Sequence, residues 1–268
     1  MTTLKKSVGP PKKGSENDNG PIISVRNLSR IYGTRGNSVK ALEDISFNVA
    51  RGEFVTILGP SGCGKTTLLN IIAGFDTASD GTATMDGKRI VGPSAHRGVI
   101  FQDSNALFPW FTVRGNIAFG PRAARLPANE VTERVDRVLE LIGLKEFAQK
   151  FPLQLSGGMR QLVAIARVLV MDAKLLLMDE PFAALDAITR QRMLEQLVEI
   201  WQRARPAVLF ITHSVDEALY LGDRVIVMTG RPGQVREILT ITLARPRDVS
   251  LPEFNELRGR ALSLLCQK

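Results

Sequence analysis

The most informative segment of this 268-residue chain reads Gly59-Pro60-Ser61-Gly62-Cys63-Gly64-Lys65-Thr66-Thr67. It matches G-x-x-x-x-G-K-[ST], follows an apolar strand expected over 53–58, and precedes an apolar helix. Glycines let backbone N–H groups turn inward around phosphate oxygens, and the helix N-terminus adds the positive end of its dipole. Lys65 is expected to reach the β- and γ-phosphates, and the Thr66 hydroxyl to ligate Mg²⁺. A glycine-rich turn without a ligand is the alternative, but the flanking strand and helix favour a phosphate site.

A second feature is the acid pair Asp179-Glu180, which ends the apolar run 175–178. In a parallel α/β sheet the carboxyl ends of the strands form the ligand crevice, so these acids should lie beside the phosphate loop. We expect Asp179 to hold Mg²⁺ through water and Glu180 to polarise an attacking water as general base. A solvated strand end is the alternative, which the nearby phosphate loop disfavours.

Composition is that of an ordinary globular protein. Hydrophobic residues make up 44% and charged residues 23%, which excludes wholesale disorder and a disulfide scaffold. No run approaches the roughly 18–20 apolar residues of a membrane span, and the N-terminus lacks an apolar signal-peptide core, so we expect a soluble chain. The net charge is +8, but the basic excess beyond the first 20 residues is diffuse, and we expect no nucleic-acid partner.

The two cysteines, Cys63 and Cys266, lie far apart, and neither has a partner at metal-ligand spacing. A reducing compartment is therefore the simpler interpretation. Cys63 lies inside the phosphate loop, where we expect a small neutral filler, with a redox switch as the other possibility.

Hydrophobic periodicity predicts an α/β domain with appended segments. Residues 1–20 are expected to form a flexible tail. Strands are expected over 22–28, 45–49, 53–58, 82–85, 99–101, 175–178, 207–212 and 224–229, and helices over 128–143, 158–171, 187–203 and 215–221. The alternation of helix and strand indicates a parallel sheet, and the helical stretch at about 103–160 is interpreted as an insertion. Residues 246–268 are expected to form an amphipathic helix that docks on the protein's own surface, with a partner helix as the alternative.

The run Leu155–Gln161, LSGGMRQ, resembles the LSGGQ signature of ATP-binding cassette (ABC) ATPases, and it precedes Glu180 at that family's spacing. Other elements of that family follow in order: the adenine-stacking aromatic Tyr32, the Q-loop Gln102, the D-loop Ala184-Leu185-Asp186 and the switch histidine His213. The resemblance covers about residues 22–235. It implies a P-loop NTPase domain over 21–245, with a RecA-like parallel-sheet core, an antiparallel β subdomain and an inserted helical subdomain.

The resemblance also implies ATP as the nucleotide, Mg²⁺ as the metal, and a role for each matched residue. The implied catalytic residues are Glu180, His213, Gln102 and Lys65. The implied nucleotide contacts are Tyr32, Gly59, Pro60, Ser61, Gly62, Cys63, Gly64, Lys65, Thr66, Thr67, Ser156, Gly157, Gly158 and Asp186. The implied metal contacts are Thr66, Gln102 and Asp179.

Some of these residues are expected to act across a homodimer that forms in the ATP-bound state. In the family, the signature run contacts the γ-phosphate held by the opposite subunit, and a helix N-terminus suits that contact. A Ser156 helix cap followed by a Gly-Gly turn fits the local sequence equally well. Asp186 is expected at the dimer interface, with a helix cap as the alternative. His213 is expected to hold the γ-phosphate and to orient Glu180.

Segment 104–113 contains three aromatic residues within four positions. In the family this region receives a coupling helix of the permease, which aromatic anchors suit; burial in the helical subdomain is the alternative. Short phrases such as 96–102, 230–233 and 244–247 look like the nitrate/sulfonate/taurine importer subgroup. That resemblance implies integral-membrane permease subunits, an indirect periplasmic or extracellular binding-protein partner, and a peripheral place on the cytoplasmic face of the inner membrane.

The prediction is therefore the ATP-hydrolysing subunit of an importer for a small anion, namely nitrate, taurine or an alkanesulfonate. A soluble ABC ATPase acting on ribosomes or nucleic acid is the first rival, although such relatives usually carry two cassettes or a long coiled coil. A nucleic-acid-binding module would depend on the net charge alone. The signature run and His213 argue against a P-loop kinase.

Overall fold

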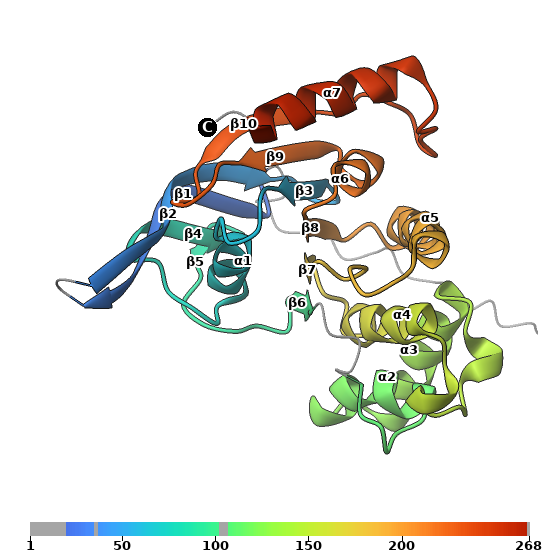
Figure 1. Cartoon of the computed structure of the whole chain (residues 1–268). Helices are drawn as coiled ribbons and strands as arrows, with labels where there is room; N and C mark the ends of the chain where they lie inside the picture. The colour runs from blue at the N-terminus through green and yellow to red at the C-terminus, as the bar shows by residue number, and fades with distance from the viewer. Residues whose placement is uncertain (1–19, 35–36, 102–106, 267–268) are drawn as a thin grey trace, which may run out of the picture.

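The computed structural model describes residues 20–34, 37–101 and 107–266 (Figure 1). Its centre is a six-stranded sheet. From edge to edge, the strands are β10 (Val235–Thr240), β9 (Arg224–Met228), β3 (Phe54–Leu58), β8 (Ala207–Thr212), β7 (Leu175–Asp179) and β6 (Arg97–Ile100). The strands from β9 to β6 pair in parallel, which confirms the expected parallel sheet. The sequence did not predict β10, which pairs antiparallel with β9.

A smaller antiparallel sheet lies beside the large one. Its strands, in spatial order, are β2 (Asn37–Val49), β1 (Ile23–Thr34), β4 (Asp80–Met85) and β5 (Lys88–Arg89). Helix α1 (Lys65–Ala73) packs between the two sheets, and Leu68 and Leu69 share a core cluster with both. Strands β1 and β2 are longer than expected because their mutual hydrogen bonds continue through exposed residues that no hydrophobic pattern marks.

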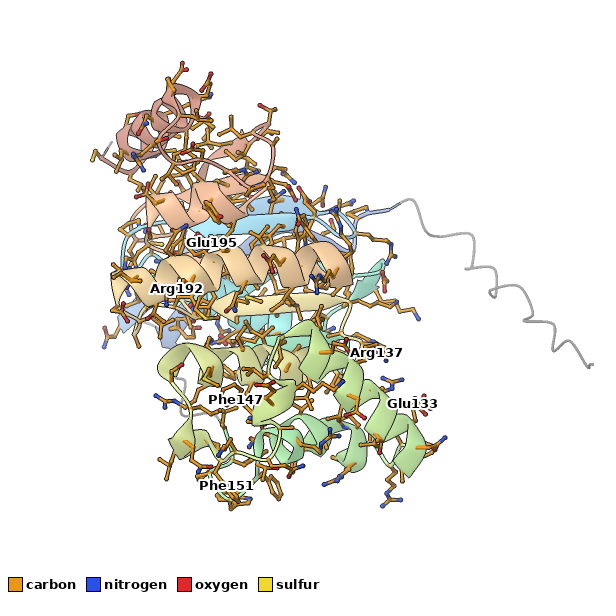
Figure 2. All side chains as sticks on the ribbon, turned by 90° about the vertical axis from the view of Figure 1, so that its right-hand side faces the viewer. Glu133, Arg137, Phe147, Phe151, Arg192 and Glu195 are labelled. Atoms are coloured by element: carbon orange, nitrogen blue, oxygen red, sulfur yellow. The ribbon has the colours of Figure 1, made fainter. Side chains whose placement is uncertain are left out.

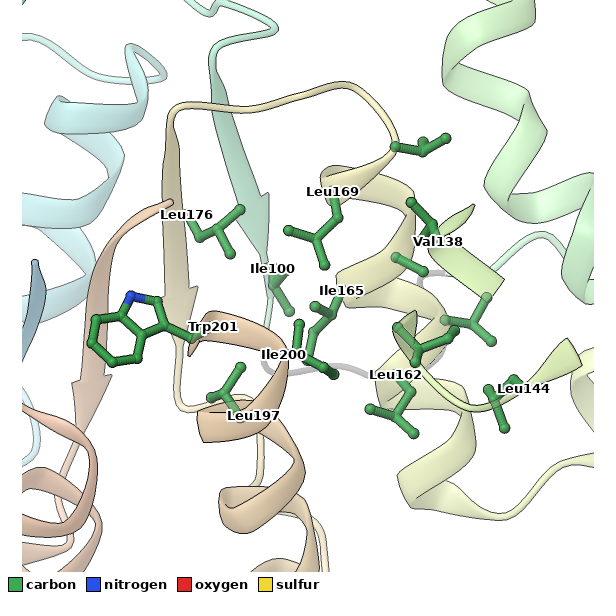
Figure 3. Packing of buried hydrophobic residues seen from close by; sticks show 14 of the residues in the cluster. Ile100, Val138, Leu144, Leu162, Ile165, Leu169, Leu176, Leu197, Ile200 and Trp201 are labelled. Atoms are coloured by element: carbon green, nitrogen blue, oxygen red, sulfur yellow. The ribbon is translucent and has the colours of Figure 1, made fainter. Parts of the chain in front are cut away.

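Helices α4 (Gly157–Leu169) and α5 (Ala187–Ala204) cover the other face of the large sheet. Helices α2 (Val113–Ala123) and α3 (Ala128–Leu141) pack on α4, with 3-10 turns at Lys145–Phe147 and Pro152–Gln154. Figure 3 shows their core, where Ile165 and Leu169 of α4 pack with Leu176 of β7 and Trp201 of α5. The insertion boundary expected near residue 160 falls inside α4, because this helix packs on the sheet as well as on α2 and α3.

Helices α6 (Val215–Leu221) and α7 (Pro252–Cys266) complete the fold. Helix α7 lies against β9 and α6, and its residues Phe254, Ala261 and Leu264 are buried. Docking of the C-terminal helix on the protein's own surface is therefore confirmed. The helix begins at Pro252 rather than at residue 246, and a proline is well suited to this first helical position. Among the described residues, no helix combines the length and apolarity that a membrane crossing requires.

Candidate active site

The phosphate loop joins β3 to α1, as the sequence predicts. Gly62 and Gly64 have φ angles of 75° and 96°, which glycine adopts without strain. A Cβ on Gly64 would lie 2.8 Å from the carbonyl oxygen of Ala41, because β2 approaches the loop closely. Lys65 Nζ donates hydrogen bonds to the carbonyl oxygens of Gly59 (2.9 Å) and Pro60 (3.0 Å). The lysine is therefore folded back across its own loop.

Thr66 and Asp179 are distant in sequence and adjacent in the structure. The Thr66 hydroxyl donates a hydrogen bond of 2.8 Å to Asp179 Oδ2. Burial raises the pKa of Asp179; the Glu180 charge acts in the same direction, whereas the Thr66 hydrogen bond and the Lys65 charge oppose the rise. Hydroxyl and carboxylate oxygens are ligands that Mg²⁺ accepts alongside water and phosphate. The pair therefore fits the metal contact predicted for it.

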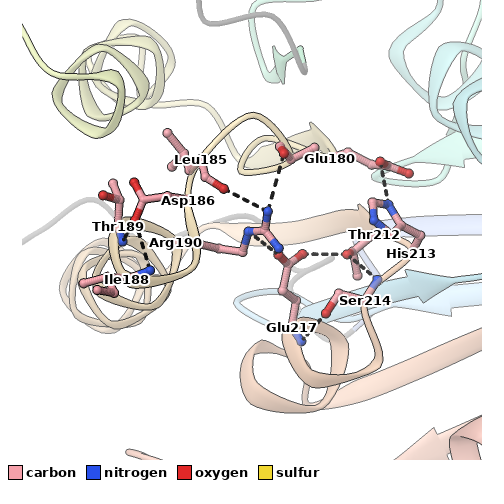
Figure 4. A network of polar contacts seen from close by, with 11 residues as sticks. Glu180, Leu185, Asp186, Ile188, Thr189, Arg190, Thr212, His213, Ser214 and Glu217 are labelled. Atoms are coloured by element: carbon pink, nitrogen blue, oxygen red, sulfur yellow. Dashed lines mark hydrogen bonds and ion pairs between the residues drawn. The ribbon is translucent and has the colours of Figure 1, made fainter.

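Glu180 follows β7 in a left-handed conformation, with φ of 45°. Its N–H donates a hydrogen bond of 3.0 Å to the carbonyl of Ile211 in β8, which holds this turn. Its Oε2 lies 2.8 Å from His213 Nδ1, and its Oε1 lies 3.8 Å from Lys65 Nζ (the histidine contact is drawn in Figure 4). A non-glycine residue in such a conformation is typical of functional sites. Three of the predicted catalytic residues thus meet, and Gln102 lies outside the described residues.

A cleft of about 470 Å³ opens beside these groups. Its lining residues are Tyr32, Val39, Ala41, Ser61, Gly62, Gly64, Lys65, Thr66, Thr67, Asp179, Glu180 and Arg231. Tyr32 is 39% exposed; its hydroxyl donates to Asp76 (2.6 Å), and the Arg30 guanidinium lies 4.5 Å from the ring centre. The tyrosine predicted to stack on adenine is therefore held in place at the cleft.

Sequence reasoning missed three lining residues, and three residues of the predicted phosphate loop do not line the cleft. Arg231, Val39 and Ala41 come from segments distant in sequence, and only the Gly- and Pro-containing turn around Arg231 gave a signal. Gly59 and Pro60 instead supply the carbonyls that accept from Lys65. Cys63 is buried, and its burial raises the pKa of the thiol, which favours the neutral filler over a redox switch.

The signature residues and the D-loop aspartate lie at helix N-termini. Ser156 Oγ accepts a hydrogen bond from Met159 N (3.2 Å) and caps α4. Asp186 Oδ1 accepts from Ile188 N (3.1 Å) and Thr189 N (3.0 Å) and caps α5. Within one chain both residues therefore make the caps that local sequence allows. Neither they nor the two signature glycines are among the described residues that line the cleft of their own chain, so contacts with a second chain's nucleotide stay a prediction.

The described part of the segment predicted to meet a permease, 107–113, carries an exposed aromatic cluster. Trp110 is 67% exposed, and Phe119 of α2 is 42% exposed. The ring centre of Phe108 lies 4.5 Å from that of Phe119 and 5.6 Å from that of Trp110. Of the three aromatic residues in the predicted segment, Trp110 is therefore exposed, whereas Phe108 and Phe111 are half-buried.

Comparison with known proteins defines the family. Residues 42–183 match the family described as ABC transporter. The chain is 51% identical to an uncharacterized ABC transporter ATP-binding protein of Methanocaldococcus jannaschii, over 91% of each chain. It is 43% identical to the taurine import ATP-binding protein TauB of Jannaschia sp. (strain CCS1), over 91% of this chain and 93% of that protein. Identity to the aliphatic sulfonates import ATP-binding protein SsuB of Bacillus thuringiensis is 41%, over 90% and 94%.

Solved structures agree with this assignment. The protein cbiO1 of Clostridium perfringens, part of an ABC transporter complex, superposes with a TM-score of 0.75 at 30% identity, over 91% of this chain and 97% of that one. A dimeric ATP-binding cassette bound to ADP and phosphate gives 0.68 at 28% identity, over 83% and 100%. The fold and the site thus define a nucleotide-hydrolysing cassette. The chain belongs to the ABC transporter family, as an ATP-binding subunit that couples ATP hydrolysis to transport.

Proposed function

We propose that the chain energises import of a small anion, either taurine, an alkanesulfonate or nitrate, through a separate permease. The relatives named for taurine and aliphatic sulfonates support taurine and an alkanesulfonate as substrates. The short segments that resemble the nitrate/sulfonate/taurine importer subgroup support all three anions. The observation that carries the hydrolytic role is the 2.8 Å contact of Glu180 with His213 beside Lys65. A binding protein would deliver the anion to the permease on the far side of the membrane, and this subunit would lie peripherally on the cytoplasmic face.

The geometry supports hydrolysis with water as the nucleophile. Glu180 orients the attacking water and accepts its proton, while His213 Nδ1 holds the glutamate carboxylate at 2.8 Å. Lys65 exchanges its two loop carbonyls for the β- and γ-phosphates. Thr66 and Asp179 would hold Mg²⁺, which when bound neutralises phosphate charge. The backbone of the phosphate loop keeps the γ-phosphate within reach of Glu180.

A second copy of the chain would complete each site. Ser156 caps α4 and Gly157 and Gly158 open it, and the backbone N–H groups and dipole of a helix N-terminus suit a γ-phosphate held by the other copy. The dimeric cassette among the similar structures supports this arrangement. Dimer closure would exclude water and strengthen each electrostatic contact with the phosphate.

Trp110 and Phe119 are the residues proposed to receive the permease. Their exposure in one cluster suits an apolar helix that enters a groove. Arg167 lies over the Phe108 ring at 4.5 Å, which braces the cluster from the α4 side. When ATP closes the dimer, the aromatic clusters of the two copies would move together, and this movement would be transmitted to the permease.

The test is growth of a strain that lacks this gene, complemented with wild type, Glu180→Gln or Glu133→Gln. Taurine or an alkanesulfonate would be the sole sulfur source, and nitrate the sole nitrogen source. We expect a defect on one source that wild type and Glu133→Gln rescue and Glu180→Gln does not; Glu133 is exposed on α3 (Figure 2). Normal growth on every source without the gene would contradict the proposed substrates. Purified Glu180→Gln should form ATP-dependent dimers without turnover, and a monomer at saturating ATP would contradict the mechanism.

A further inference from the structure

A buried carboxylate lies behind the histidine of the site. Glu217, in the first turn of α6, is 7% exposed, and its burial raises its pKa. Residues 214–217 have the S-x-x-E spacing of a capping box, in which the glutamate would accept a hydrogen bond from the Ser214 N–H. In the structure that N–H donates to Thr212 Oγ1 (2.9 Å), and Glu217 Oε2 accepts from the Thr212 hydroxyl (2.6 Å). The carboxylate is therefore not used to close the capping box.

Arg190 of α5 lies on the other side of this carboxylate. Its Nε is 3.7 Å from Glu217 Oε1, and its Nη2 donates to the carbonyls of Leu185 (2.9 Å) and Ala183 (3.4 Å). Those carbonyls belong to the loop 183–186, which carries Asp186. A planar guanidinium can face the carboxylate and the loop carbonyls together, whereas a lysine ammonium is a single point charge on a flexible stem.

The contacts close a ring that returns to Glu180 (Figure 4). Thr212 and Ser214 flank His213 in sequence, and both hydrogen-bond to Glu217. His213 in turn contacts Glu180, whose carbonyl accepts a hydrogen bond of 3.1 Å from the Ala183 N–H. The turn that bears the histidine and the loop that bears Asp186 are thus attached to one polar frame.

We propose that Arg190 and Glu217 are positioning residues for ATP hydrolysis: they hold the loop 183–186 in register with the turn that carries His213. A displacement of that loop then reaches the carboxylate of Glu180 through this ring. Arg190 and Glu217 are absent from the residues that line the described cleft, so they act through His213. This inference rests on the hydrolytic role of Glu180 and not on which anion is imported.

Two variants separate this role from simple packing of α5 on α6. Glu217→Gln keeps the shape and an acceptor for Thr212 but removes the charge that faces Arg190. Arg190→Lys keeps the charge but loses the guanidinium fork. The control is Arg192→Met, because Arg192 lies on the same helix and is exposed (Figure 2). The measurements are kcat and KM for ATP, and the urea midpoint, of each full-length protein.

We expect both test variants to lower kcat by about tenfold or more with KM for ATP within about threefold, and the control to match wild type. The urea midpoint of Glu217→Gln should not fall at neutral pH, because the raised pKa of Glu217 means that folding disfavours its ionised form even beside Arg190. An unchanged kcat would overturn the proposal. So would a loss of kcat accompanied by a proportionate fall in the urea midpoint, which is the result of a purely structural pair.

A double-mutant cycle identifies the route. If Glu217 acts through His213, adding Glu217→Gln to His213→Ala should slow turnover no further, since the residue it positions is already absent. Losses that multiply would show independent roles and refute the positioning model. The assay contains neither a permease nor an imported anion, so failure of the growth test would leave its result unaffected.

Discussion

Replacing Gly64 by alanine should destabilise the protein before any nucleotide binds. Gly64 has φ of 96°, and an alanine held in a left-handed conformation costs about 1–2 kcal/mol. Its Cβ would also lie 2.7 Å from Leu42 Cδ2 and 2.8 Å from the Ala41 carbonyl oxygen. Forcing extra volume into such a contact adds about 1–3 kcal/mol, while the stiffer unfolded chain returns about 0.4–1 kcal/mol. We expect a net loss of about 2–4 kcal/mol in the free energy of unfolding.

The matched control is Gly62→Ala in the same loop. Gly62 also has a positive φ, 75°, but a Cβ there would meet no atom within 4 Å. Only the conformational cost remains, about 1 kcal/mol after the gain from the unfolded chain. Urea unfolding of the two nucleotide-free variants, followed by circular dichroism, measures the difference. Equal losses would refute the reasoning, because the contact of β2 with Gly64 would then carry no cost.

Three further predictions concern other parts of the molecule. Burial raises the pKa of Asp179, so the free energy of unfolding falls as pH rises from the ordinary pKa of an aspartate through the raised one. Asp179→Asn should therefore raise Tm at pH 7 without nucleotide and flatten the pH dependence of Tm in thermal scans. Arg247→Met leaves three carbonyls at the end of α6 without their donor and should lower the free energy of unfolding by about 2–4 kcal/mol in urea titrations. Trp110→Ala should retain ATPase activity in solution while abolishing rescue of growth.

Sequence patterns predicted the helices, whose hydrogen bonds join residues close in sequence, and the strands that are buried along their whole length. The buried strands β3, β7 and β8 are near-continuous apolar runs, and their sequences alone marked them. Strand β10 was missed because its residues are mostly half-buried and its hydrogen-bond partner is β9. The extended ends of β1 and β2 were not predicted either, because their residues are exposed and their hydrogen-bond partners lie on another strand.

The candidate site shows the same division. The spacing from Gly59 to Thr67 predicted a phosphate site, because a phosphate loop and its helix are contiguous in sequence. The acid pair after β7 predicted the metal contact and the general base. The strand ends of a parallel sheet predicted that Asp179 would lie near the phosphate loop that carries Thr66, and the family resemblance predicted that His213 would orient Glu180; the structure supplied the distances.

Other contacts could not be obtained from local spacing at all. Residues 214–217 have the pattern of a capping box, yet Glu217 accepts from Thr212 and faces Arg190. Arg231 likewise reaches the cleft from beyond β9. The class of fold, the phosphate loop and the acid pair could be derived from the amino-acid sequence, since these features depend on neighbours along the chain. The pairing of Glu217 with Arg190 could not, because it depends on how α5 and α6 pack against the sheet.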